Sequence, residues 1–194
     1  MEALIPTATS FPFERDVFLK EENNRLYSVF PYFISKCILY IPYTIVIPII
    51  YSLIIYWMVD LSSTAEQFFL FYLTVCMVSL SGNSIGLLIG SLVDSAKSVS
   101  IATTLFFLPF ILVSGFFKNF DSMPAWFGWF QYINPFKYTF ICLTINEVKH
   151  RESNINDLNF DLEFWPCIGL LGALAVGYRL LSLFYLWYLR KTME

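Results

Sequence analysis

One stretch of the sequence carries a pattern that could be catalytic. Residues 82–86 read Gly-Asn-Ser-Ile-Gly and match the G-x-S-x-G pattern of serine hydrolases. In those enzymes a strand-to-helix turn exposes the serine, and a histidine accepts its proton. Here the match lies within the uncharged residues 67–93, and the only histidine, His150, lies in a distant polar segment. We therefore expect no catalytic residue in this chain.

Phosphate and metal chemistry also find no support in the residues. No glycine is followed by lysine, so the G-x-x-x-x-G-K-[ST] phosphate cradle is absent and the chain alone cannot hydrolyse ATP by that mechanism. The cysteines form no C-x-x-C pair and lack the spacing of a metal site. We predict no cofactor or metal site in this chain, and free buried thiols at Cys37, Cys76, Cys142 and Cys167.

The same glycines favour a structural or transport role. On a helix Gly82, Gly86 and Gly90 are spaced at i, i+4 and i+8, so they present bare backbone along one face where another helix can approach closely. Asn83 and nearby serines add polar groups over the same turns. This pattern indicates helix packing or the lining of a path for substrate or water, and both interpretations stay open.

Arg179 is the one charge inside the apolar residues 164–189. A charge at such depth costs at least about 2.5 kcal/mol on insertion scales, so it must face protein, water or a lipid headgroup. Helical side chains lean toward the N-terminus of their helix, here the expected outer side, which makes snorkelling to the cytoplasmic surface harder. The residue indicates a structural role in the bundle or a role in coupling or substrate passage.

Residues 13–28 have the charge pattern of an exposed helix. Asp16 with Lys20 and Glu21 with Arg25 are i,i+4 pairs with the acidic residue first, the more favourable order. Such a helix either lies solvated on a membrane surface or docks on a cytoplasmic partner. The pattern alone does not choose between these two interpretations.

The amino-acid composition indicates that most of the chain lies in a lipid bilayer. Hydrophobic residues make up 57% and charged residues 14% of the 194 residues, whereas soluble domains carry about 25% charged residues. About 20 apolar residues form a helix that crosses the hydrocarbon core, and backbone groups in lipid must bond within the helix. We predict an all-α polytopic transmembrane bundle with four full spans, at residues 37–59, 67–93, 98–117 and 164–189.

The basic residues predict the orientation of these spans. With four spans, residues 13–36, Lys97 and the C-terminal end share one side of the membrane, and that side holds more Lys and Arg than the other. The positive-inside rule then places both termini in the cytoplasm. The net charge of −3 is small and the charges are clustered, so no nucleic-acid partner is expected.

Residues 118–163 form the outer segment in this orientation. The first part is rich in aromatic side chains, which favour the headgroup level of a bilayer. Pro124 suits the start of a helix and Pro135 breaks one, so two pieces too short to span are expected, as a re-entrant or interfacial helix pair. Residues 147–163 are polar and predict an exposed loop.

Several sequence stretches resemble one transporter family. They are FPFERDVFLKE (11–21), YFISK (32–36), IYWMVDL (55–61), SGFF (114–117), MPAWFGWFQYINPFKYTF (123–140) and NE (146–147). Over residues 11–190 the chain resembles the White/ABCG ABC half-transporters, and in particular the C-terminal part of their ABC-2 type transmembrane domain. The outer stretch at 123–140 is the most specific part of this resemblance.

The resemblance implies a single membrane domain over residues 1–194. In the family, six spans follow an ATP-binding domain, so residues 1–13 would be the tail of a preceding span and the four spans here the third to sixth. Residues 13–36 would be a cytoplasmic coupling segment that docks on the ATP-binding domain. On this basis charge reversal at Glu14 and Arg15 should uncouple ATP hydrolysis from transport, and the coupling residues are taken to be Glu14, Arg15, Lys20 and Glu21.

The resemblance also implies the partners. ATP and Mg²⁺ would act through an ATP-binding domain, in the same full-length chain or in trans. Two membrane domains would pair as a homo- or heterodimer, with a path between them for lipids, sterols or other hydrophobic compounds, in the plasma membrane or an internal membrane. The alternative hypothesis is a non-transporting membrane scaffold that pairs with full-length relatives through the Gly82, Gly86 and Gly90 face. The sequence leaves open the substrate, the membrane, whether the dimer is homo- or heteromeric, and whether the chain is a domain excerpt, a truncated gene model or a true short protein.

Overall fold

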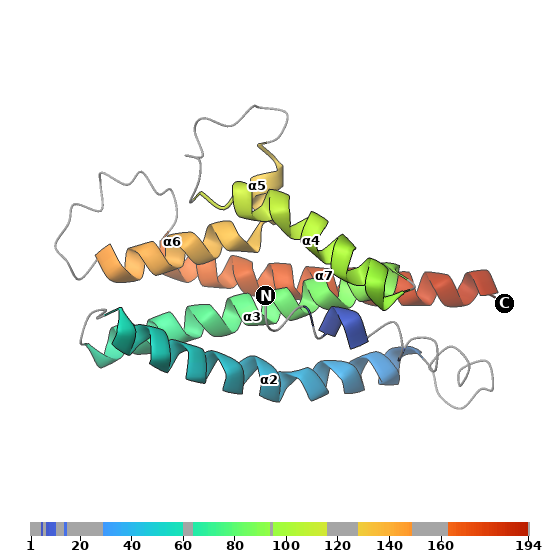
Figure 1. The fold of residues 1–194 in the computed structure, drawn as a ribbon, viewed down its shortest axis with the longest axis horizontal. Helices are drawn as coiled ribbons and strands as arrows, with labels where there is room; N and C mark the ends of the chain where they lie inside the picture. The colour runs from blue at the N-terminus through green and yellow to red at the C-terminus, as the bar shows by residue number, and fades with distance from the viewer. Residues whose placement is uncertain are drawn as a thin grey trace. The chain divides into compact units, whose positions relative to one another are not determined.

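The computed structural model is all-helical, as the sequence predicts (Figure 1). It describes residues 5, 7–10, 14, 29–59, 64–93, 95–115, 128–148 and 163–193. No strand occurs among these residues. The labelled helices are α2 (Val29–Met58), α3 (Ala65–Leu92), α4 (Ala96–Leu112), α5 (Phe130–Ile133), α6 (Pro135–Val148) and α7 (Phe164–Met193).

Three of the helices are long and apolar enough to cross a membrane. They comprise Phe30–Met58, Ala65–Leu92 and Phe164–Leu189. The fourth predicted span, residues 98–117, is not confirmed, because α4 has only 17 residues and would extend about 25 Å. That length falls short of a hydrocarbon core of roughly 30 Å.

The end of α4 explains why this helix is shorter than the uncharged run. Pro109 lies inside the helix and has no amide hydrogen to donate. Beyond it the hydrogen bonding tightens, since the Ser114 amide donates to the Ile111 carbonyl at 3.2 Å instead of one residue further back. Gly115 then takes a φ of 93°, a conformation that glycine adopts without strain and that ends a helix.

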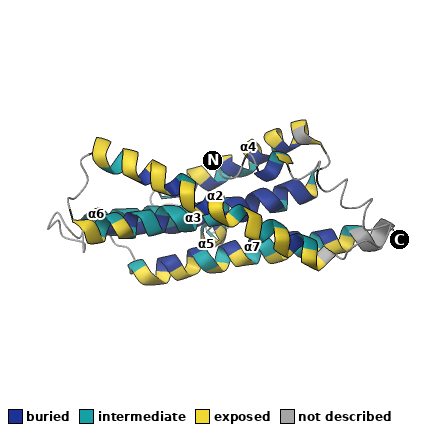
Figure 2. Cartoon of the chain, turned by 90° about the horizontal axis from the view of Figure 1, so that it is seen from below, coloured by how far each residue is buried: buried dark blue, intermediate teal, exposed yellow. Residues whose placement is uncertain are grey.

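Helix α2 differs from its prediction in the opposite direction. It begins at Val29 and continues through Lys36, whereas the charge-free run begins only at residue 37. Only 17% of its most apolar window is buried within the chain, against 50% for α3. Figure 2 shows the exposed positions in yellow along the helices. Exposed apolar side chains of this kind are suited to contact lipid or another membrane helix.

The chain divides into two compact units, which are described separately. Unit 1 comprises residues 1–44, 80–106 and 175–194, and unit 2 comprises residues 45–79 and 107–174. The core of unit 1 joins α2, α3 and α7 through Phe33, Leu87 and Leu186, with Tyr40 and Leu183 packed against them.

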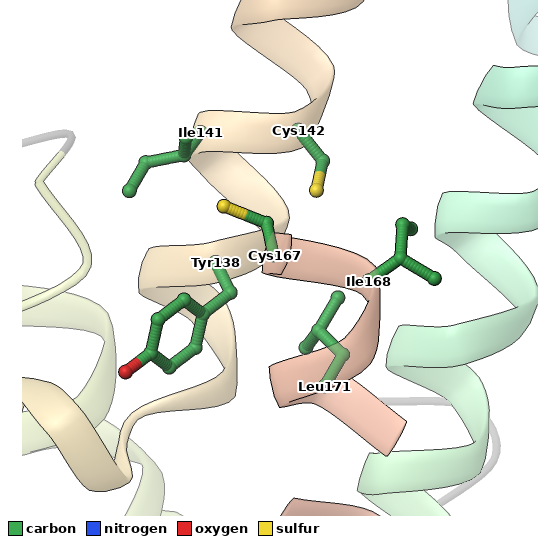
Figure 3. Close-up of a cluster of buried hydrophobic side chains, with 6 residues drawn as sticks. All are labelled: Tyr138, Ile141, Cys142, Cys167, Ile168 and Leu171. Carbon is green, nitrogen blue, oxygen red and sulfur yellow. The ribbon is translucent and has the colours of Figure 1, made fainter. Parts of the chain in front are cut away.

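The core of unit 2 lies where α6 meets the first turns of α7 (Figure 3). Its buried members are Tyr138, Ile141, Cys142, Cys167, Ile168 and Leu171. Elsewhere in unit 2, the Tyr56 ring of α2 packs edge-on against Phe68 and Phe71 of α3, with ring centroids 5.0 and 5.9 Å apart. Aromatic contacts of this geometry stabilise a helix pair beyond the area that they bury.

The helix break that the sequence predicts at Pro135 is present. Pro135 is the first residue of α6, the position where its missing amide hydrogen costs nothing. The preceding helix α5 has four residues, and the earlier part of that predicted piece, with Pro124, lies outside the described residues. The predicted loop at 147–163 begins later than expected, because Glu147 and Val148 still belong to α6. Most of that loop lies outside the described residues.

Candidate functional site

Asn83 is the centre of a buried polar site in unit 1. Its side chain is 1% exposed within α3. The Asn83 Oδ1 accepts a hydrogen bond from the Thr7 hydroxyl, and its Nδ2 donates to the Thr44 hydroxyl oxygen at 2.9 Å. The Thr44 hydroxyl in turn donates to the Tyr40 carbonyl at 2.9 Å. We call Thr7, Asn83, Thr44 and the Tyr40 carbonyl the Asn83 hydrogen-bond chain.

The donors and acceptors of these groups follow one consistent order along the Asn83 hydrogen-bond chain. A hydroxyl has one hydrogen to give and two lone pairs, so Thr44 can receive from Asn83 while donating within its own helix. The amide uses its oxygen toward one threonine and its nitrogen toward the other. The result joins three separate segments: the helical residues 7–10, α2 and α3. Breaking one link removes a hydrogen bond from a buried polar group, at a cost of about 1–3 kcal/mol.

The small polar residues near Asn83 mostly satisfy their own helix. Ser84 donates to the Leu80 carbonyl at 2.8 Å and Ser91 to the Leu88 carbonyl at 2.7 Å. From α7, Ser182 donates to the Leu87 carbonyl of α3 at 3.3 Å. These hydroxyls therefore serve the packing of α7 against α3 as well as the backbone of α3.

The glycine face of α3 is not uniform. Gly86 and Gly90 are buried, whereas a Cβ placed on Gly82 would meet no atom within 4 Å. Among the described residues, no side chain or backbone of another helix comes within that distance of Gly82. The interpretation of these glycines as a packing face or substrate path stays a prediction.

Arg179 places part of its guanidinium in a buried setting in unit 1. Its Nε and Nη2 atoms are buried and have no hydrogen-bond partner. The guanidinium lies within electrostatic range of Cys37 in α2. Breaking or omitting the partner of a buried charge is costly, which explains why a compensating group is expected near Arg179. The structural and the coupling interpretations of this residue both remain open.

Of the four predicted coupling residues, the structure describes Glu14. Glu14 forms an ion pair with Lys36 on the first turns of α2, and the Lys36 amine also lies 5.8 Å from the centroid of the Tyr32 ring. The Glu14 and Lys36 side chains are 36% and 20% exposed, so the pair is worth about 1 kcal/mol or less. Arg15, Lys20 and Glu21 lie outside the described residues.

Two asparagines of unit 2 were missed by the sequence reasoning. Asn134 is fully buried, accepts from the Phe136 amide at 2.9 Å, and donates to the Phe110 carbonyl at 2.7 Å. It therefore caps α6 and binds the last turn of α4 at once. The Asn-Pro pair before a helix was a usable signal for the cap, while nothing in the sequence indicated the bond to Phe110.

Asn146 makes the second of these connections. Its Nδ2 donates to the Gln67 carbonyl at 3.2 Å, which ties the last turns of α6 to the first turn of α3. The Asn146 Oδ1 is buried without a partner. Sequence reasoning noted Asn146 only as part of a resemblance, because a contact across 79 positions leaves no local pattern.

Comparisons with known proteins agree with this arrangement. The profile of the family described as "ABC-2 type transporter" matches residues 1–148 of the 194. The chain is 28% identical over 204 residues to "ABC transporter G family member 1" of Dictyostelium discoideum, which covers 93% of the chain and 26% of the relative. "Protein white" of Ceratitis capitata is 33% identical over 141 residues, covering 73% of the chain and 21% of the relative.

A third relative is "ABC transporter G family member 36" of Arabidopsis thaliana, 33% identical over 145 residues. The chain spans about a quarter or less of the length of these relatives. Three helices long and apolar enough to cross a membrane are in keeping with a membrane-embedded domain. The chain belongs to the ABC-2 type transporter family, and its relatives are ABCG/White transporters. The resemblance predicted from the sequence is thereby confirmed.

Proposed function

We propose that this chain is the membrane-spanning part of an ATP-driven exporter of lipids, sterols or other hydrophobic compounds. The observation that carries the proposal is the ABC-2 match over residues 1–148, on helices whose exposed faces are apolar. Relatives named "ABC multidrug transporter", such as that of Aspergillus fumigatus, support hydrophobic substrates. The energy would come from an ATP-binding domain in the same full-length chain or in trans.

ATP and Mg²⁺ are not assigned to residues of this chain. The sequence contains no Gly-Lys pair, which the backbone cradle for ATP phosphates requires. The contribution of the chain is therefore mechanical: its helices would alternate between inward- and outward-open arrangements. Both termini would lie in the cytoplasm, in keeping with the distribution of basic residues.

The route from the ATP-binding domain would enter through residues 13–36. Glu14 pairs with Lys36 on α2, and the Asn83 hydrogen-bond chain joins the same part of α2 to α3 and to residues 7–10. Displacement of the coupling segment would thus act on α2 first and reach α3 through Thr44 and Asn83. A second membrane domain, identical or related, would complete the substrate path.

The experiment uses the full-length transporter in proteoliposomes, with its ATPase rate and the export of a fluorescent lipid analogue measured together. We expect Glu14→Lys and Lys36→Glu each to lower the ratio of transport to ATP hydrolysis about fivefold, the effect of roughly 1 kcal/mol. The double variant restores the opposite charges and should recover the ratio.

Unchanged ratios in both single variants would remove Glu14 and Lys36 from the coupling route. Loss of ATP hydrolysis and transport together, with no recovery in the double variant, would instead indicate a folding defect. The unfolding temperature of each variant separates that case from uncoupling. Export by neither wild type nor variants, with normal dimer formation, would favour the scaffold hypothesis.

A further inference from the structure

Cys142 and Cys167 form a thiol pair that the transport hypothesis does not use. Cys142 belongs to α6 and Cys167 to the first turn of α7, and both side chains are 0% exposed. Figure 3 shows both sulfur atoms between the two helices. The two thiols lie close enough to interact, and the Cys142 thiol donates to the Phe164 carbonyl oxygen at 3.8 Å.

Buried apolar side chains of α6 and α7 surround both thiols. Tyr138 precedes Cys142 by one helical turn and Leu171 follows Cys167 by one turn, so each lies on the same helix face as its cysteine. All four belong to one buried core, together with Ile141 and Ile168. Because this core is close-packed, both thiols are held within the contact between α6 and α7.

The other two cysteines lack this arrangement. Cys37 and Cys76 are half-buried. Cys37 packs beside the apolar core of unit 1, and Cys76 hydrogen-bonds Tyr72 one helical turn away. Of the four free thiols in the structure, Cys142 and Cys167 are the two that share a buried core and lie close enough to interact.

The position of the pair along the helices indicates its compartment. Cys142 lies six residues before the end of α6, and Cys167 is the fourth residue of α7. At 1.5 Å per residue both lie within about 10 Å of the helix ends that residues 149–162 connect. In the orientation expected from the basic residues, those ends face the extracytoplasmic side, where disulfides form and persist.

We propose that Cys142 and Cys167 are joined by a disulfide bond in the mature transporter, which closes residues 142–167 into a covalent loop and ties α6 to α7. This differs from the sequence expectation that all four cysteines stay free. It depends on the orientation of the chain in the membrane and not on transport activity.

The bond would form by thiol–disulfide exchange with an oxidised dithiol oxidoreductase of that compartment. One cysteine thiolate attacks a sulfur of the oxidant's disulfide, and the other oxidant sulfur leaves as a thiolate. The second cysteine thiolate then attacks the mixed disulfide and displaces the remaining oxidant sulfur. The two cysteines lose two electrons and two protons, and the oxidant becomes a dithiol. Because both thiols are buried once α6 and α7 have packed, the exchange would precede their packing.

The test is peptide mapping of the full-length protein from native membranes. Free thiols are blocked with N-ethylmaleimide during denaturation, and the protein is digested with trypsin without reduction. Cleavage after Lys137, Lys149, Arg151 and Arg179 places Cys142 in residues 138–149 and Cys167 in residues 152–179. We expect a linked species of these two peptides that separates on reduction, whatever other cysteines the full-length protein contains.

Matched variants sharpen the result. In Cys142→Ser the linked species should disappear and Cys167 should be recovered with the maleimide label, whereas Cys76→Ser should leave the linked species unchanged. Recovery of both wild-type peptides in labelled form, with no linked species, would overturn the proposal. This outcome is read on the wild-type protein, so it does not depend on the folding of any variant.

Discussion

Asn83 shows how a single buried amide can hold three segments together. It lies at 1% exposure and uses both ends of its side chain, one toward Thr7 and one toward Thr44. An apolar residue of similar size would fill the same space but would leave the Thr7 hydroxyl without its acceptor. The residue therefore stabilises this particular pairing of segments through its hydrogen bonds.

Replacing Asn83 tests this role. We expect Asn83→Ala to destabilise the full-length protein by about 1–3 kcal/mol in detergent, because both side-chain hydrogen bonds are lost in a buried setting. Thr104→Ala is the matched control, since its exposed hydroxyl bonds only the Ser100 carbonyl of its own helix, and it should stay within about 0.5 kcal/mol. Unfolding with a chemical denaturant measures both, and an equal effect of the two variants would contradict the prediction.

The sequence identified Asn83 as a polar residue of a packing face but not its partners. Thr44 lies 39 positions away and Thr7 lies 76 positions away. Contacts of this range depend on which helices meet, and that follows from the summed packing of many apolar side chains. Arg179 was likewise recognised as a buried charge, while its surroundings required the structure.

At the scale of elements, the apolar runs predicted where helices exist but not where they end. Helix α2 begins eight residues before its charge-free run. A charged residue does not interrupt backbone hydrogen bonding, and the Lys36 amine pairs with the Glu14 carboxylate. Helix α4 ends before its run does, because Ser114 and Gly115 turn the backbone without any charge to mark the place. The positions of charges depend on side-chain solvation, whereas the ends of helices depend on backbone hydrogen bonding. Charge-free runs therefore do not give helix ends.

The start of α6 offers a test of one such end. Asn134 accepts from the Phe136 amide and donates to the Phe110 carbonyl, so two different atoms perform two different roles. Asn134→Asp keeps the accepting oxygen and loses the donor, whereas Asn134→Ala loses both. We expect Asn134→Ala to lower the free energy of unfolding by about 1–2 kcal/mol more than a surface substitution through the lost cap. The lost hydrogen bond to Phe110 adds to this cost.

The comparison of the two variants separates the cap from the link to α4. Thermal unfolding in detergent should place Asn134→Asp between wild type and Asn134→Ala if capping dominates. Because a charged carboxylate facing the Phe110 carbonyl is unfavourable, an Asp variant as unstable as the Ala variant would mean that the link to α4 dominates. Wild-type stability of both variants would show that Asn134 fixes neither helix end.

At the scale of the whole molecule, the open space at Gly82 concerns pairing between chains. In the part of the chain that the structure describes, a Cβ placed there would meet no atom within 4 Å beyond its own stretch of α3. Gly82→Leu should therefore fold normally, with a gain in helix propensity of up to about 1 kcal/mol. If a second membrane domain approaches this face, the larger side chain should greatly reduce co-purification of two differently tagged copies.

The control for this prediction is Gly177→Leu in α7, which also meets no atom within 4 Å. Its copies should still co-purify. Equal recovery from both variants would mean that pairing uses another surface. Loss of pairing in Gly82→Leu without any loss of transport would separate assembly from export and count against the proposed dimeric path.

Helix α2 has a further consequence when it is considered as a mechanical element. Its 30 residues extend about 45 Å, well beyond the roughly 30 Å of hydrocarbon that it has to cross. Within α2, Thr44 lies eight residues, or about 12 Å, after Lys36, which contacts Glu14. If residues 13–36 couple ATP hydrolysis to transport as proposed, a displacement at Lys36 would be passed along the helix to Thr44. The hydrogen bond between Thr44 and Asn83 would then respond to that displacement, lengthening or breaking when the Lys36 end of α2 moves.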